Sequence, residues 1–161
     1  MGMAVLDIDG VLADVRHRLT HVQRRPKDWD AFFAAAPDDT PLPEGLDRAT
    51  ELAARGDIVY LTGRPERCRL DTETWLTNHG FPNAHVLMRP DTDRRPARMF
   101  KLDEVRRLAT SATIDLVVDD DALVVDTLIA AGFRVEHAQW MPETKPQQTS
   151  LFDAQEREGR T

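Results

Sequence analysis

The stretch MAVLDIDGVL, residues 3–12, determines the fold expected for this chain. Its first four residues are apolar, Asp7 and Asp9 follow two positions apart, and Gly10 permits a sharp turn. A short apolar run that ends in acids is typical of a buried parallel strand with functional groups at its carboxyl end. Side chains two apart on an extended segment share a side, so Asp7 and Asp9 can converge on one ligand.

Four more short apolar runs follow, and helical segments separate them. The expected strands cover residues 3–8, 58–61, 85–88, 114–118 and 133–137, and the expected helices cover residues 44–55, 66–79, 97–109 and 122–131. This alternation predicts an α/β domain with a doubly wound, Rossmann-like, parallel sheet of five strands.

The length of 161 residues fits one domain, which we expect to cover residues 1–140. Residues 13–43 form a short insertion after the first strand, too small for a large cap. Three aromatic residues at helical spacing within it predict a short helix that packs on the body. Residues 141–161 are polar and contain two prolines, so we expect a flexible tail.

The net charge of −7, from 21 basic and 28 acidic residues, excludes a protein that is basic all over its surface. No apolar run approaches the ~20 residues that cross a bilayer, and no secretory signal is visible. Cys68 is the single cysteine, so a reducing cytoplasm is the expected location. His17 and His21 lie four apart, but they lack companion ligands for zinc.

Polar residues also follow two other expected strands. Thr62-Gly63-Arg64 supplies a hydroxyl, a backbone N–H and a guanidinium, which together suit an anion. Asp119-Asp120-Asp121 follows the fourth strand, and Lys101 lies in the helix before it. Each group alone is also typical of a turn or a helix cap. Because parallel strands place their carboxyl ends at one edge, the groups together predict a phosphoryl-transfer site.

Acidic clusters at neighbouring strand ends repel each other unless a cation lies between them. Ligands that are all oxygen favour Mg²⁺ over Zn²⁺. The sequence therefore predicts a magnesium site at this edge of the sheet.

The motifs Asp7-Ile-Asp9-Gly10-Val11-Leu12, Thr62, Lys101 and Val117-Val118-Asp119-Asp120 occur in this order. Together they resemble the four-motif signature of the haloacid dehalogenase (HAD) superfamily, over roughly residues 3–137. The resemblance implies a HAD-like fold and Mg²⁺-dependent phosphatase chemistry through an aspartyl-phosphate. It implies that Asp7 is the nucleophile and Asp9 the general acid and base.

The same resemblance assigns the remaining motif residues. It implies that Thr62 and Lys101 bind the phosphoryl group. It also implies that the metal is held by Asp120 with Asp119, by Asp7, and by the backbone carbonyl of Asp9.

Within the superfamily, the chain is most similar to the 3′-phosphatase domains of polynucleotide kinase–phosphatases. Arg18 after the first motif and Gly63-Arg64 in the second match that subfamily, so we expect Arg18, Gly63 and Arg64 to bind the substrate phosphate. The subfamily has an acid shortly before the motif lysine, whereas Ala97 stands four residues before Lys101 here. The implied substrate is the 3′-phosphorylated end of a nucleic acid.

Two other functions remain open. One is a phosphatase for a small nucleotide or another metabolite. An open site, and seven basic against four acidic residues in 89–107, favour a polymer end instead. The other is a non-enzymatic phospho-acceptor domain, which is disfavoured because Arg89-Pro90 stands where receiver domains place the acceptor.

The tail contains a possible partner motif. Gln148–Phe152 resembles the Gln-x-x-Leu-Phe peptide through which bacterial replication and repair proteins bind the sliding clamp. Leu151 and Phe152 would be its apolar anchors. The alternative is a short helix over residues 151–158 that packs on the domain.

Overall fold

The computed structural model describes residues 2–142 and 145–160, with only the backbone for residues 145–150. Its main sheet has five strands in the order β5-β4-β1-β6-β7. The strands are β1 (Met3–Leu6), β4 (Asp57–Pro65), β5 (His85–Arg89), β6 (Ile114–Asp119) and β7 (Val135–His137). All neighbouring pairs are parallel, which confirms the predicted fold class.

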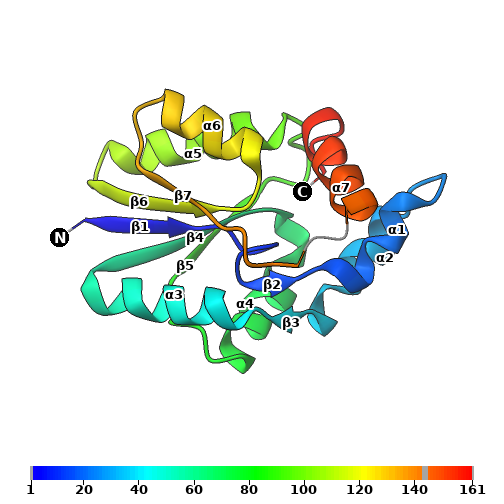
Figure 1. The fold of residues 1–161 in the computed structure, drawn as a ribbon, viewed down its shortest axis with the longest axis horizontal. Helices are drawn as coiled ribbons and strands as arrows, with labels where there is room; N and C mark the ends of the chain where they lie inside the picture. The colour runs from blue at the N-terminus through cyan, green and yellow to red at the C-terminus, as the bar shows by residue number, and fades with distance from the viewer. Residues whose placement is uncertain (1, 143–144, 161) are drawn as a thin grey trace.

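Helices cover both faces of this sheet (Figure 1). On one side lie α3 (Pro43–Arg55) and α4 (Arg69–Asn78), and on the other lie α5 (Ala97–Ala109) and α6 (Ala122–Ala130). The apolar core is accordingly divided into two clusters. Ala4 and Leu6 of β1 belong to one cluster, and Val5 between them belongs to the other. The period of two is that of a strand buried on both faces.

The register of the central strand brings the polar motifs to one edge. Leu6 of β1 lies beside Tyr60 of β4 and Val118 of β6. The residues that follow these positions, Asp7 and Asp119 among them, therefore leave the sheet together at its carboxyl edge.

The insertion after β1 lies beyond that edge (Figure 1). Its β2 (Ala13–Asp14) and β3 (Thr40–Pro41) pair antiparallel. Between them come η1 (Arg16–Arg18), α1 (Thr20–Gln23), α2 (Trp29–Ala34) and η2 (Ala36–Asp38). The predicted aromatic helix is α2, where the rings of Trp29, Phe32 and Phe33 are buried against one another. Asp28 caps it by accepting from the Ala31 amide at 2.9 Å.

One boundary differs from the prediction in a way that affects the site. The strand expected over residues 58–61 is longer, because β4 continues through Thr62-Gly63-Arg64 to Pro65, which pairs with Arg89 of β5. A short 3₁₀ turn, η3 (Glu66–Cys68), then leads into α4. The extended backbone places Thr62 and Arg64 on the same side of the strand.

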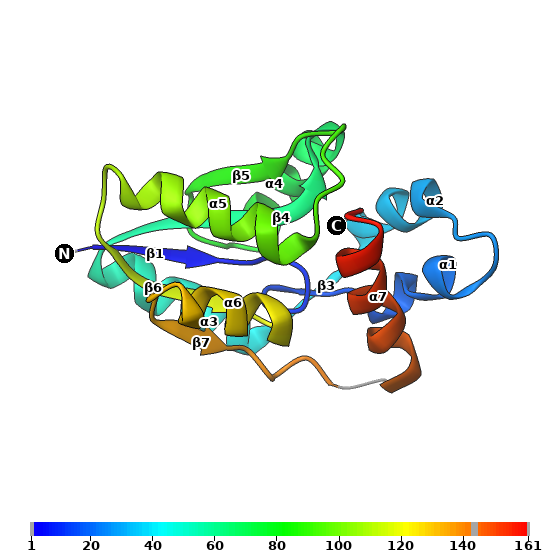
Figure 2. The same cartoon turned by 90° about the horizontal axis from the view of Figure 1, so that it is seen from above.

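The expectation of a flexible tail is wrong for residues 145–157, which form helix α7 (Lys145–Arg157). Leu151 is 4% exposed and Ala154 is fully buried. Beyond the helix, Glu158 pairs with Lys27 at 2.5 Å. Figure 2 shows α7 beside α1, and it also contacts α5. Packing and ion pairs therefore stabilise a segment whose composition alone favours disorder.

The sliding-clamp prediction falls partly on residues whose side chains lie outside the described part of the chain, Gln148 among them. Leu151, one of its two anchors, packs in the core instead of facing a partner. The alternative of a packed helix over residues 151–158 agrees with the structure as far as Arg157. Among the described residues, no helix combines the length and apolar character that crossing a bilayer requires.

Candidate active site

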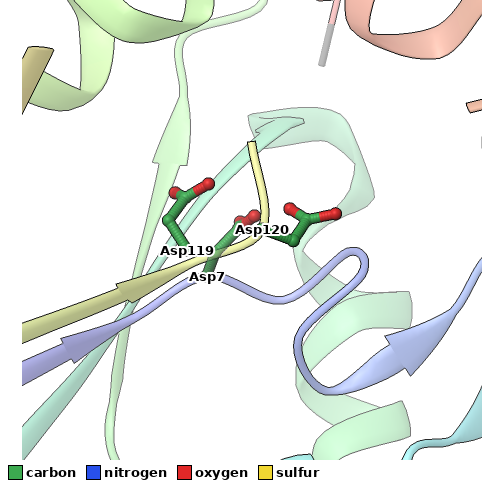
Figure 3. A group of neighbouring side chains, drawn as sticks. All are labelled: Asp7, Asp119 and Asp120. Atoms are coloured by element: carbon green, nitrogen blue, oxygen red, sulfur yellow. The ribbon is translucent and has the colours of Figure 1, made fainter. Parts of the chain in front are cut away.

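Three carboxylates meet at the carboxyl edge of the sheet. Asp7 follows β1, Asp119 is the last residue of β6, and Asp120 follows it. Each offers an oxygen, and these oxygens all lie within 4.8 Å of one another. Figure 3 shows the three side chains gathered at the adjoining ends of β1 and β6.

Lys101 of α5 provides the cation nearest to this group. Its Nζ lies 2.6 Å from Oδ2 of Asp119 and 3.0 Å from Oδ2 of Asp7. Burial alone would lower the pKa of the lysine, but the two carboxylates outweigh burial and raise it, so Lys101 is charged. The predicted motif lysine thus lies against the predicted nucleophile.

One lysine does not neutralise three carboxylates. Burial, together with repulsion from Asp119 and Asp9, raises the pKa of Asp7 to about 7 despite Lys101. Burial and the charges of Asp7 and Asp119 also raise the pKa of Asp120 well above its usual range. The site therefore has too little positive charge, as expected where carboxylates bind a divalent cation.

The turn after β1 is shaped to admit Asp120. Gly10 has a φ of +79°, and a Cβ at this position would lie 1.9 Å from Oδ2 of Asp120. Only glycine allows both the backbone conformation and the close approach. Asp121, by contrast, caps α6 by accepting from the Leu123 amide at 2.9 Å, as the helix-cap interpretation of this acidic run predicts.

Asp9 lies in a different environment from Asp7. Its Oδ1 accepts from Nε and Nη2 of Arg64, at 2.9 and 2.6 Å, and from Nη2 of Arg18 at 3.0 Å. Burial works against ionisation, but Arg64 and Arg18 outweigh it and lower the pKa of Asp9 to about 2. Both arginines are almost completely buried, at 0–1% exposure.

The insertion supports Arg18, and β4 supports Arg64. The Arg18 guanidinium lies 4.3 Å from the centre of the Phe32 ring. Arg64 donates from Nη1 to the hydroxyl of Thr72 in α4 at 3.2 Å, and its amide donates to Oγ1 of Thr62 at 3.1 Å. Thr62, Gly63 and Arg64 are all buried. Phosphate binding by Arg18, Thr62, Gly63 and Arg64 stays a prediction.

Asp39 is a member of this cluster that the sequence analysis missed. It is 2% exposed and pairs with Arg18 and Arg64. In the sequence Asp38-Asp39-Thr40 looks like an ordinary polar turn, because nothing local indicates a partner more than twenty residues away.

The basic run over residues 89–107 is largely paired within the domain. Arg95 pairs with Asp93 and Asp103, Arg98 pairs with Glu156, and Arg107 pairs with Glu104. Much of the charge expected to attract a nucleic acid is therefore balanced locally.

The match to a family model covers most of the chain. The model described as the polynucleotide kinase PNKP phosphatase domain matches residues 2–139. No curated protein matches the chain.

The solved structures that resemble the chain share its fold. A chain in the structure of the Pnkp1/Rnl/Hen1 RNA repair complex is 19% identical with a TM-score of 0.69, over 89% of this chain and 44% of that one. The class C acid phosphatase from Bacillus anthracis is 21% identical with a TM-score of 0.65, and the match covers 94% of this chain and 72% of that one. A putative beta-phosphoglucomutase from Thermotoga maritima is 15% identical with a TM-score of 0.56, and the match covers 99% of this chain and 95% of that one. The chain spans less than half of the RNA repair chain.

Proposed function

We propose that this chain, which belongs to the family of polynucleotide kinase PNKP phosphatase domains, is a HAD-type phosphatase that hydrolyses phosphomonoesters through an aspartyl-phosphate on Asp7. We further propose that its substrates are the 3′-phosphorylated ends of nucleic acids. One observation carries the mechanism: Asp7 and Asp9, two residues apart, have different partners. Nζ of Lys101 lies 3.0 Å from Oδ2 of Asp7, and Asp119 and Asp120 offer oxygens close by, so a phosphoryl group and a cation can meet at Asp7. Asp9 instead accepts from Arg64 and Arg18 through Oδ1, which leaves its Oδ2 without a hydrogen-bond partner and suited to the leaving oxygen.

The residues at the strand ends fit a magnesium ion. Asp7, Asp119 and Asp120 offer three oxygens close together, and Gly10 leaves the space that the Asp120 carboxylate occupies. Hard oxygen ligands of this kind suit Mg²⁺. When bound, the ion would neutralise charge at the phosphoryl oxygens. A contribution from the backbone carbonyl of Asp9 is part of this proposal.

In the first step, an oxygen of Asp7 attacks phosphorus, and the bond to the leaving oxygen breaks. Lys101, 3.0 Å from Oδ2 of Asp7, offsets repulsion between the carboxylate and the phosphate. Asp9 gives a proton to the leaving alkoxide. In the second step, Asp9 takes a proton from water, and the water oxygen bonds to phosphorus. The bond between Asp7 and phosphorus breaks, which releases inorganic phosphate and restores the Asp7 carboxylate.

Two buried atoms without a hydrogen-bond partner support these roles. They are Oδ2 of Asp9 and Nη1 of Arg18. A buried polar group is normally paired, so an unpaired acceptor and an unpaired donor in one cluster suit a ligand that supplies both partners. The oxygens of a phosphate ester can accept from Arg18, and a water molecule or a leaving hydroxyl can donate to Asp9. A phosphate near the arginines would also raise the pKa of Asp9 toward the acid form.

The nucleic-acid substrate is supported by the matched family and by the RNA repair complex that contains a chain of similar fold. The local pairing of the basic run favours the alternative, a small phosphorylated metabolite. Phosphate release should therefore be measured from one oligonucleotide phosphorylated at its 3′ or its 5′ end, as DNA and as RNA. Mononucleotides and sugar phosphates complete the panel, with the Asp7→Asn protein as the blank.

We expect the 3′-phosphorylated oligonucleotide to have the highest kcat/KM, at least about tenfold above the 5′ form. Equal rates on both ends, or faster turnover of a small ester, would instead establish the metabolite phosphatase. No release from any ester in the presence of Mg²⁺ would refute the proposed activity.

A further inference from the structure

Asp39 has no role in the chemistry described so far, yet its side chain is completely buried beside the general acid and base. It follows η2 and precedes β3 in the insertion. Its backbone is fixed on both sides, because its amide donates to the Ala36 carbonyl at 3.1 Å and its carbonyl accepts from the Trp75 indole at 2.9 Å. The carboxylate is therefore held in one place.

The carboxylate of Asp39 binds the same two guanidiniums as Asp9. Arg18 donates to it through Nε at 2.8 Å and through Nη2 at 2.9 Å, which is a bidentate pair. Arg64 donates to it through Nη2 at 3.1 Å. Two buried cations are thus shared between two buried anions, and the charges of the four groups balance.

This sharing leaves the arginines bound to one oxygen of Asp9. Every hydrogen bond from Arg18 and Arg64 to Asp9 ends on Oδ1, while Oδ2 is buried with no partner. A guanidinium beside a lone carboxylate normally forms the two-pronged pair that occupies both oxygens. Arg18 instead forms its bidentate pair with Asp39, and it binds Asp9 through Nη2 alone.

We propose that Asp39 is a positioning residue, which holds Arg18 and Arg64 so that Oδ2 of Asp9 stays free for proton transfer to the leaving group. This inference rests on the proposed function, because it needs Asp9 to act on the leaving oxygen. Without Asp39, both guanidiniums have Asp9 as their nearest anion and can bind both of its oxygens. The step most affected is then leaving-group protonation, and attack by Asp7 is affected least.

The test is the leaving-group dependence of kcat/KM in the Asp39→Asn protein. The esters compared are p-nitrophenyl phosphate, whose leaving group needs no proton, and alkyl phosphates or the preferred oligonucleotide, whose leaving groups need one. We expect kcat/KM to fall at least about tenfold more on the unactivated esters than on p-nitrophenyl phosphate. The Asp38→Asn protein is the matched control, because this neighbouring acid is exposed.

The His17→Ala protein is a second, milder variant. His17 contacts Oδ1 of Asp39 at 2.7 Å, and its side chain is 40% exposed, so folding should tolerate the change. We expect the same selective loss at about threefold, and no loss for His21→Ala. Should Asp39→Asn fail to fold, this smaller selective loss is the deciding measurement.

A loss of equal size on all esters in a folded variant would make Asp39 merely structural and would overturn the inference, and so would no loss. Failure of the wild-type protein to release phosphate from any ester in the presence of Mg²⁺ would refute the proposed function instead. The two failures are therefore distinguishable.

Discussion

Asp7 and Asp9 are the same residue type only two positions apart, and yet the protein surrounds them with opposite charges. Asp7 faces Asp119 and Asp120 at the strand ends, with Lys101 as the nearest cation, and its pKa rises to about 7. Asp9 faces two buried arginines, and its pKa falls to about 2. The partners, rather than the Asp-x-Asp motif, make the two carboxylates electrostatically different.

The two environments also have different structural origins. The acidic half, with Lys101, is built from the doubly wound sheet and its helix α5. The arginine half depends on the insertion, which contributes Arg18 and Asp39, and on Arg64 at the end of β4. Changes in the two halves should therefore affect different properties of the protein.

The largest expected effect is that of Asp7→Asn on turnover. The amide has nearly the same shape but is not a competent nucleophile, so we expect kcat/KM to fall at least about 10⁴-fold on every ester. The free energy of unfolding without metal should stay equal or rise at pH 8, because one of three repelling charges is removed. Phosphate release and urea unfolding measure the two quantities. Residual turnover close to that of the wild type would refute the role of Asp7.

Asp9→Asn should lose activity in a way that depends on the ester. We expect kcat/KM to fall by about 10²–10⁴-fold on unactivated esters and clearly less on p-nitrophenyl phosphate. Unlike Asp7→Asn, this change removes one of two anions that balance buried arginines, so it should cost about 3 kcal/mol of stability. Urea unfolding of both variants gives the comparison. Equal stability of the two asparagine variants would contradict the contrast between the two environments.

Arg64→Lys should reduce kcat/KM by about 10–100-fold, and Arg18→Lys by a similar factor. Each arginine binds two carboxylates through several N–H groups of one planar guanidinium, and a lysine has neither the fork nor its reach. Arg106→Lys, at an exposed position of α5, is the control. Wild-type kcat/KM in both lysine variants would show that these arginines neither bind substrate nor place Asp9.

The acidic half of the site could be predicted from the sequence because its determinants are local. Each acid follows an apolar run, parallel strands end at one edge, and only the helix that carries Lys101 had to be placed. Helix α5 over residues 97–109 was predicted with its observed bounds.

The arginine half could be predicted only in part. The motifs indicated Arg18 and Arg64, but not that both are buried against Asp9, and Asp39 left no local signal. Helix α7 was missed for a similar reason. Its stability comes from the burial of Leu151 and Ala154 against distant elements, which no property of the tail itself reveals.

The smallest expected effect is a difference between Asp7 and Asp9 in how pH changes their contributions to stability. In the metal-free protein, burial raises the pKa of Asp7 to about 7, above the ~4 of an unfolded chain. Between these two pH values the folded protein keeps a proton on Asp7 that the unfolded chain has lost. This contribution stabilises the fold at low pH and is lost as the pH rises through about 7. The lowered pKa of Asp9 has the opposite sign, and its contribution is lost only as the pH falls toward about 2.

Magnesium must displace the proton from Asp7, so its apparent Kd should rise by about tenfold per pH unit below pH 7 and level off above it. The raised pKa of Asp120 acts in the same direction. Melting temperatures with and without Mg²⁺ at pH 5.5 and pH 8 measure this, and we expect the larger stabilisation by Mg²⁺ at pH 8. Asp7→Asn should reduce the difference between the two pH values, whereas the exposed control Asp38→Asn should keep it. Equal stabilisation at both pH values in the wild type would mean that protons do not compete for the acidic half, and Mg²⁺ would then bind elsewhere.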